Sequence, residues 1–160
     1  MVRFKNRWLL IEFIHLSTLD ASSKTGPLNI RPLDGKQIYN ALRDSIVANF
    51  GDTGWGAVGM SLTVKYFSPT TNLCIVRVAR DHHRIAWGAV TLLTLIDDVR
   101  VIPHVVHVSG TIKHAQLSAI AHNREVIAQF RAKTNNPALY QDSYDDYLAQ
   151  STREIEALQD

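Results

Sequence analysis

Two hydrophobic periodicities alternate along the chain, and their order constrains the fold more than any other feature of the sequence. Alternating or short continuous apolar runs predict strands, whereas apolar residues three or four positions apart predict helices. The predicted strands span residues 8–16, 58–66, 73–79 and 99–108, and two helices, capped by Asp34 and Asp81, run to about Phe50 and Ile96. The resulting order of strand, helix, strand, strand, helix, strand is the split βαβ arrangement.

A third helix and an acidic segment follow this core. Residues from Thr111 to about Lys133 carry apolar residues at helical spacing, and Pro137 ends the pattern. We therefore predict an α/β (α+β) sandwich with an RNA-recognition, or ferredoxin-like, βαββαβ core and an added C-terminal helix. Residues 1–133 form a single domain in this interpretation, with a loop insertion at 17–33, and residues 134–160 form an acidic tail that can become helical.

Charge is distributed unevenly between these two parts. Residues 1–133 hold sixteen Lys/Arg and nine Asp/Glu, a net charge of +7, whereas residues 134–160 hold one Arg and six Asp/Glu, a net charge of −5. A basic body fits a polyanionic partner, although a basic protein with a solvating tail explains the charge alone equally simply. The lone cysteine, Cys74, excludes an intramolecular disulfide and a Cys-based zinc site, and no run of about 18 apolar residues predicts a membrane span. We expect a soluble intracellular protein.

A glycine-rich stretch, "GWGAVG" at residues 54–59, has the spacing G-x-G-x-x-G. Dinucleotide binding requires a strand before this motif and a helix after it. Here the predicted order is the reverse, which excludes that function. We instead predict a tight or bulged loop in which Gly54 and Gly56 present Trp55, either as an anchor for a protein interface or as a cap on the core.

No residue pattern predicts catalysis or metal binding by the protein. His104 and His107 are three apart on a predicted strand, so we expect them on opposite faces unless a bulge intervenes. The pair Asp97–Asp98 is typical of a turn rather than of an acid–base pair. We therefore name no catalytic residue, no metal ligand and no cofactor.

Basic residues are the candidates for a binding site. Arg3, Lys5 and Arg7 alternate just before the first buried strand, where three cations about 7 Å apart match the spacing of phosphates. The stretch "VSGTIKHA" places Ser109, Gly110 and Thr111 at a strand-to-helix turn, followed by Lys113, which is suited to an anion but is also a plain helix cap. Lys113, Arg124 and Arg131 lie within about 20° of one another on one helix face. The strand "LCIVRVA" has no aromatic residue to stack on bases, so we predict contacts to phosphates only.

Four stretches together resemble the Pop-five family of small protein subunits of ribonuclease P and ribonuclease MRP: "MVRFKNRWLL", "VKYFSPTTNLCIVRV", "RDHHRIAWGAVTLL" and "HVSGTIKHAQ…HNRE". The resemblance covers nearly all of residues 1–133, and the loop and tail look fungal. It implies a non-catalytic subunit that braces the catalytic domain of an RNA enzyme, which matures the 5′ ends of precursor tRNA and processes ribosomal RNA. It also implies that Mg²⁺ is bound by the RNA subunit and that the particle resides in the nucleus and nucleolus.

Partners are likewise implied by this resemblance. They are the ribonuclease P/MRP RNA, a TIM-barrel-type protein subunit and other proteins of the particle, with precursor tRNA contacted indirectly and no membrane. In such proteins the loop after the first helix pairs with a like subunit, which favours an interface at Gly54, Trp55 and Gly56. Two alternatives are an RNA-independent interaction module and an acylphosphatase-like enzyme; "SSKTGPLNIRPL" is too poor in glycine for the phosphate loop of such an enzyme.

Overall fold

The central strand of the protein is β1 (Asn6–His15), and the rest of the sheet is built outward from it. The computed structural model describes residues 5–16, 32–133 and 141–160. The elements after β1 are α1 (Gly35–Val58), β2 (Thr63–Ser68), β3 (Leu73–Ala79), η2 (Arg80–His82), α2 (His83–Thr91), β4 (Leu95–Ile96), β5 (Val99–Ser109), α3 (Ile112–Lys133) and α4 (Gln141–Glu156). The strands lie in the order β2-β3-β1-β5-β4 and pair antiparallel throughout. The predicted ferredoxin-like fold is confirmed.

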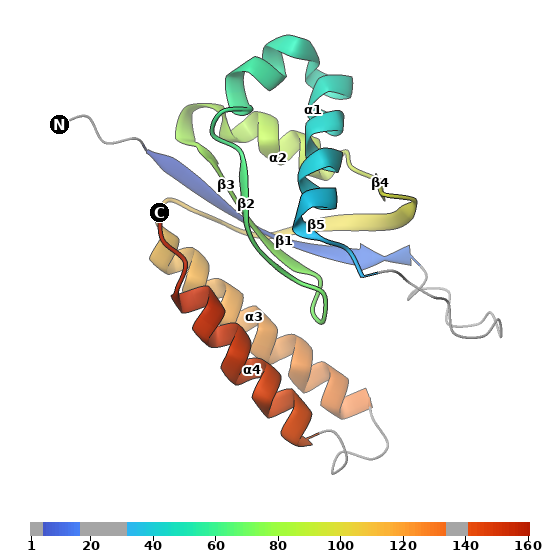
Figure 1. Cartoon of the computed structure of the whole chain (residues 1–160), viewed down its shortest axis with the longest axis vertical. Helices are drawn as coiled ribbons and strands as arrows, with labels where there is room; N and C mark the ends of the chain where they lie inside the picture. The colour runs from blue at the N-terminus through green and yellow to red at the C-terminus, as the bar shows by residue number, and fades with distance from the viewer. Residues whose placement is uncertain (1–4, 17–31, 134–140) are drawn as a thin grey trace.

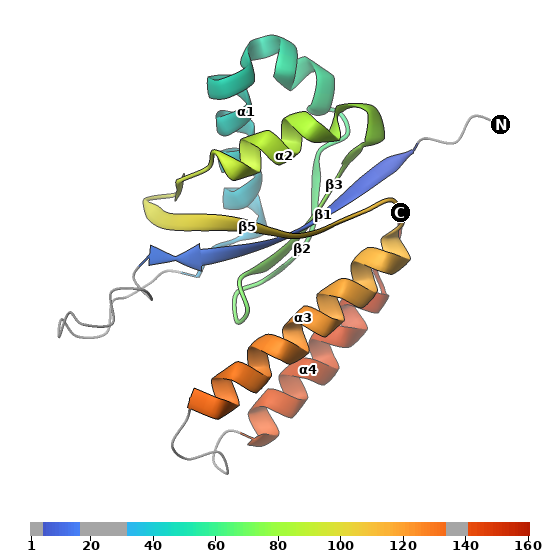
Figure 2. The ribbon, with the colours of Figure 1, turned by 180° about the vertical axis from the view of Figure 1, so that it is seen from behind.

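Two hydrophobic cores lie on opposite faces of this sheet, because helices cover both faces (Figure 1, Figure 2). Leu9, Ile11 and Phe13 pack in the core beneath α1 and α2, whereas Trp8 and Leu10 pack in the core beneath α3 and α4. Side chains alternate between the faces of a strand. The apolar residues of both parities in β1 are therefore explained by burial on both sides.

The first helix is longer than predicted. Asp34 caps α1 as expected: its carboxylate accepts a hydrogen bond from the Gly35 N–H (2.7 Å), and the Gln37 side chain accepts one from the Asp34 N–H (2.9 Å). The helix bends at Gly51, whose φ of +68° suits glycine, and then continues to Val58. The predicted loop at residues 54–59 is therefore wrong, because helical geometry resumes after the bend.

This extension shortens the next strand, which begins at Thr63 rather than at residue 58. Val58 is buried as part of α1, and Met60 is fully exposed instead of alternating into a core. The alternating apolar pattern of residues 58–62 arises from a helix end and a turn, so it was not a strand signal.

Two glycines on the extended part of α1 provide a matched test of this geometry. A Cβ atom on Gly54 would lie 2.4 Å from the Phe50 Cβ, whereas one on Gly56 would meet nothing within 4 Å. We expect Gly54→Ala to destabilise the protein by about 1–3 kcal/mol through overpacking. Gly56→Ala should stabilise it by about 0.5–1 kcal/mol, since alanine is the better helix former. Urea denaturation followed by circular dichroism measures both, and equal effects of either sign would contradict a helix here.

The second helix is shorter than predicted. It ends at Thr91, and Leu95 and Ile96 form β4, which pairs with Arg100 and Val99. Asp97 and Asp98 both have positive φ, +44° and +66°, as in the tight turns that join two-residue hairpins. The predicted turn is thus confirmed. The predicted cap is not, because α2 has no side-chain cap and Asp81 lies in η2.

Strand β5 has the edge character predicted from Pro103. Among the described residues, β4 pairs only with its first two residues, while Pro103 pairs with Phe13 of β1 on the other side. The ladder between β1 and β5 also shifts register between Leu10 and Ile11. Because of this bulge, His104 is opposite Glu12 and His107 is opposite Leu10, so both histidines share the α3 face. The prediction of opposite faces is wrong.

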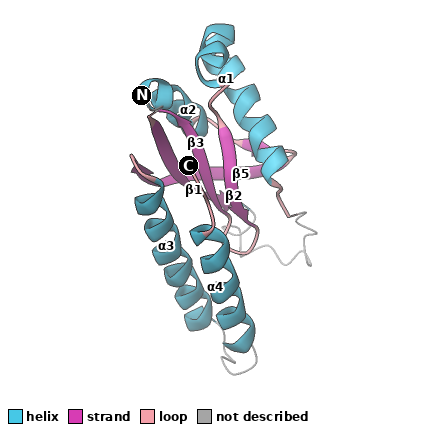
Figure 3. Ribbon diagram, turned by 60° about the vertical axis from the view of Figure 1, so that its left-hand side comes forward, coloured by secondary structure: helices cyan, strands magenta, loops and turns pink. Residues whose placement is uncertain are grey.

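The acidic segment forms α4, which packs beside α3 on one face of the sheet (Figure 3). Ile155 is fully buried in the same core as Trp8. The Gln116 side chain of α3 donates hydrogen bonds to the carbonyls of Ile155 (2.9 Å) and Leu158 (3.0 Å). Residues 141–160 therefore complete the second helical layer.

Candidate nucleic-acid interface

Cations from four segments gather at one end of the sheet. This end holds the start of β1, the end of β3, the end of β5 and the start of α3, which lie together in both ribbon views (Figure 1, Figure 2). The strand register brings Asn6 opposite Ala79 and Trp8 opposite Ser109. We name this surface the basic end; it comprises Lys5, Arg7, Arg77, Arg80, Gly110, Thr111 and Lys113.

The opening strand and the strand-to-helix turn, predicted separately, meet at Arg7. A Cβ atom on Gly110 would lie only 3.3 Å from the Arg7 Nη1 atom. That same guanidinium nitrogen donates a hydrogen bond to the Asn6 carbonyl (3.2 Å). Glycine at position 110 therefore leaves room for the guanidinium of Arg7 beside the first turn of α3. Two basic motifs far apart in the sequence thus form one surface.

The turn itself is held by two hydroxyl groups. The Ser109 hydroxyl is buried, accepts a hydrogen bond from the Thr111 N–H (3.1 Å) and donates one to the Thr111 carbonyl (2.7 Å). The Thr111 hydroxyl oxygen accepts a hydrogen bond from the His114 N–H (3.4 Å), as an N-cap does. Ser109 thus shapes the turn, whereas Thr111 and Lys113 are exposed.

Two arginines of the basic end were missed in the sequence. The Arg80 N–H donates a hydrogen bond to the Lys5 carbonyl (2.9 Å), which places Arg80 directly beside the start of β1. Arg77 is opposite Trp8 in the ladder and shares its face of the sheet. The alternation of these arginines at the end of β3 was visible, but only the register shows that they join Lys5 and Arg7. The Arg80 Nε also lies 3.4 Å from the exposed Asp81 carboxylate.

The remaining predicted basic residues lie apart from this surface. Arg124 and Arg131 are about 17 and 27 Å from Lys113 along the axis of α3. Arg131 forms an ion pair with Asp145 of α4, and its guanidinium lies 5.9 Å from the centre of the Tyr144 ring. Arg124 is exposed and has no ion pair with any described residue. Arg3 lies outside the described residues.

The predicted interface residue Trp55 is turned back onto α1. Its ring packs edge-on against Tyr39, with ring centres 6.3 Å apart, and the Arg43 guanidinium lies 6.0 Å from its centre. The half-buried indole therefore caps the core, which was one of the two expected arrangements. Gly54 is buried and Gly56 is exposed. A protein interface at these three residues stays a prediction.

Other chemistry is sparse in the described part of the chain. Residues 5–16, 32–133 and 141–160 contain no group of three His, Cys, Asp or Glu that could hold a metal ion. Among the same residues, no helix is long and apolar enough to span a membrane. The fully buried Cys74 is free, and burial raises the pKa of its thiol.

This pKa shift predicts how Cys74 responds to pH. The native thiol stays neutral at pH values where the unfolded thiol, with a pKa of about 8.5, ionises. Stability contributed by the neutral thiol is therefore complete below that pH and is lost as the pH rises above it. We expect Ellman's reagent to leave native Cys74 unmodified at pH 8 and to modify it fully in urea. Rapid labelling of the folded protein would contradict its burial.

Comparisons with known proteins agree on one group of relatives. The sequence pattern that defines the Rpp14/Pop5 family matches residues 7–120. Ribonuclease P/MRP protein subunit POP5 of Schizosaccharomyces pombe is 42% identical over 127 residues, covering 79% of this chain and 91% of that protein. The POP5 subunits of Saccharomyces cerevisiae and Homo sapiens are 33% and 27% identical, covering 79% and 78% of this chain and 80% and 73% of those proteins.

A solved structure shares the fold. A chain in the cryo-EM structure of yeast ribonuclease MRP superposes with a TM-score of 0.51 at 9% sequence identity, covering 81% of this chain and 98% of that chain. At this level of identity the match concerns the arrangement of strands and helices.

Proposed function

The chain belongs to the Rpp14/Pop5 family, and on that premise we propose that it is a non-catalytic protein subunit of ribonuclease P and ribonuclease MRP. In this role it braces the catalytic domain of the RNA subunit, which carries out 5′ maturation of precursor tRNA and processing of ribosomal RNA. The Mg²⁺ required for cleavage is held by the RNA. A TIM-barrel-type protein subunit and other proteins of the particle are its protein partners, and the particle works in the nucleus and nucleolus.

The observation that carries this proposal is the contact between Arg7 and Gly110. It joins the start of β1 to the turn before α3, so that cations from separate segments face one region of solvent. Exposed lysine and arginine side chains bind phosphates and release counterions, which favours association with RNA. The backbone positions of Lys5 and Arg80 are fixed by the hydrogen bond between them. A fixed set of cations can hold an RNA backbone in one orientation without reading its bases.

The test is to purify a tagged form of the native chain from its own cells and to sequence the nucleic acid that accompanies it. We expect one structured RNA, together with several proteins, and loss of many of those proteins after nuclease treatment. Recovery of protein partners without any RNA before nuclease treatment would contradict the proposal and favour an RNA-independent interaction module. The tagged chain bearing the Arg100→Ala substitution, at the opposite end of β5, is the control for a nonspecific charge effect.

A further inference from the structure

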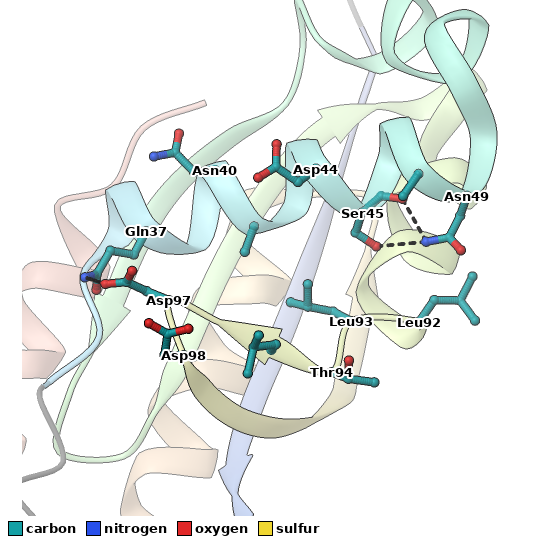
Figure 4. A pocket seen from close by; sticks show the side chains of 13 residues that line it. Gln37, Asn40, Asp44, Ser45, Asn49, Leu92, Leu93, Thr94, Asp97 and Asp98 are labelled. Atoms are coloured by element: carbon teal, nitrogen blue, oxygen red, sulfur yellow. Dashed lines mark hydrogen bonds between the residues drawn. The ribbon is translucent and has the colours of Figure 1, made fainter.

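A cleft of about 520 Å³ lies at the opposite end of the sheet from the basic end, between α1 and the segment that leads from α2 to β5 (Figure 4). One wall consists of α1 residues from Gln37 to Asn49, and the other consists of residues 92–98. The two walls are fastened together. The Ser45 hydroxyl donates a hydrogen bond to the Ala89 carbonyl (2.8 Å), and the Gln37 side chain donates one to the Asp97 carboxylate (2.6 Å).

One part of the cleft is apolar and open to solvent. Leu92 and Leu95 are 54% and 47% exposed, and the buried Leu93 lies between them in the sequence. Figure 4 shows Leu92 and Leu93 on the side of Ser45 and Asn49, away from Asp97 and Asp98. Large apolar side chains gathered around a cleft mark a surface that a partner covers. An RNA phosphate backbone would gain nothing from covering leucines.

The other part of the cleft is acidic. Asp44, Asp97 and Asp98 line it, and no lysine or arginine does. None of the three carboxylates forms an ion pair with a described residue. They are three of only nine acidic residues in a segment, 1–133, with a net charge of +7. Their charge repels phosphate and attracts a cationic side chain.

The β4–β5 turn fixes two of these carboxylates. Asp97 and Asp98 occupy its two positive-φ positions, and strand pairing on either side holds the turn in place. A cation entering between this turn and Asp44 would therefore meet a negative field that is already in position. The apolar and acidic parts of the cleft together define a partner with two kinds of side chain.

We propose that this cleft docks a peptide segment of a protein partner that carries an arginine or lysine at one end and a leucine-like side chain at the other. The cation lies among Asp44, Asp97 and Asp98, and the apolar side chain covers Leu92 and Leu95. The protein thus presents an RNA surface at one end of the sheet and a protein surface at the other. This inference does not rest on the ribonuclease assignment, because its test uses the purified chain.

The test is an NMR titration of the full-length ¹⁵N-labelled chain with the peptide acetyl-Leu-Ala-Ala-Arg-Ala-Leu-amide. We expect saturable shifts of amides in residues 44–49 and 92–98 at peptide concentrations up to about 5 mM. The analogue with glutamate in place of arginine and the analogue with serine in place of both leucines should not shift them. A uridine oligonucleotide should leave these amides unchanged and shift those of the basic end instead.

Matched variants complete the test. The triple variant D44N/D97N/D98N removes three cleft carboxylates, and asparagine tolerates the positive φ of the turn. We expect it to weaken peptide binding at least about tenfold. The control D52N/D142N/D146N removes three exposed carboxylates elsewhere and should bind like the parent. The proposal is overturned if no saturable shifts occur, if shifts map away from the cleft, if the oligonucleotide binds there, or if both triple variants behave alike.

Discussion

Replacement of Trp8 by alanine should lower the free energy of unfolding by about 3–5 kcal/mol, the cost typical of emptying a large aromatic site in a core. Trp8 is 1% exposed and packs against Leu10, Ala115 and Ile155, between the sheet and the α3–α4 layer. Its removal leaves a cavity under both helices, because fixed strands and helices surround it on every side. Urea denaturation followed by far-ultraviolet circular dichroism measures the loss.

Trp87 is the matched control for this prediction, since it offers the same chemistry on the surface. It is 41% exposed on α2. Trp87→Ala should cost about 1 kcal/mol, in proportion to its smaller buried area. If both substitutions cost the same, the second hydrophobic core does not contribute as the structure indicates.

Removal of three cations from the basic end should weaken binding to the ribonuclease P RNA roughly 10- to 100-fold. This estimate takes about 0.5–1 kcal/mol for each exposed ionic contact. The triple variant Lys5→Ala/Arg7→Ala/Arg80→Ala should also reduce the slope of log affinity against log salt by about 2–3 units, since each lost phosphate contact releases fewer counterions. Filter binding at several salt concentrations measures both quantities.

The charge-matched control is Lys36→Ala/Arg100→Ala/Lys133→Ala. These three residues are exposed and lie on α1, on the first residues of β5 and at the end of α3, all away from the basic end. This control should keep the parent slope and affinity within about threefold, because screening at physiological salt limits charge effects to about 8 Å. Equal losses in both triple variants would mean that net charge, and not the position of the cations, determines RNA binding.

The strand order and the two-sided burial of β1 could be predicted from local pattern. Trp8 to Phe13 are apolar at both parities, and only a central strand covered on both faces accommodates this. The bend at Gly51 could not be predicted in the same way. A glycine with positive φ usually ends a helix, yet here helix resumes because Gly54 and Val58 pack on the core side.

Contacts between segments distant in sequence account for the rest. Arg77 and Arg80 join the basic end through the β1–β3 register, which no local pattern encodes. Arg131 lies on the predicted face of α3, but the acidic segment folds back as α4 and supplies Asp145 as its ion partner. The helix face was therefore predictable, whereas the neutralisation of its last arginine was not.

Ultraviolet cross-linking of RNA to protein in the particle purified through the tagged native chain tests the central claim most directly, with cross-linked peptides identified by mass spectrometry. The account predicts cross-links at residues 5–7, 77–80 and 110–114, where β1, β3 and the start of α3 meet. Cross-links confined to other parts of the chain, such as the cleft residues 92–98, would contradict it.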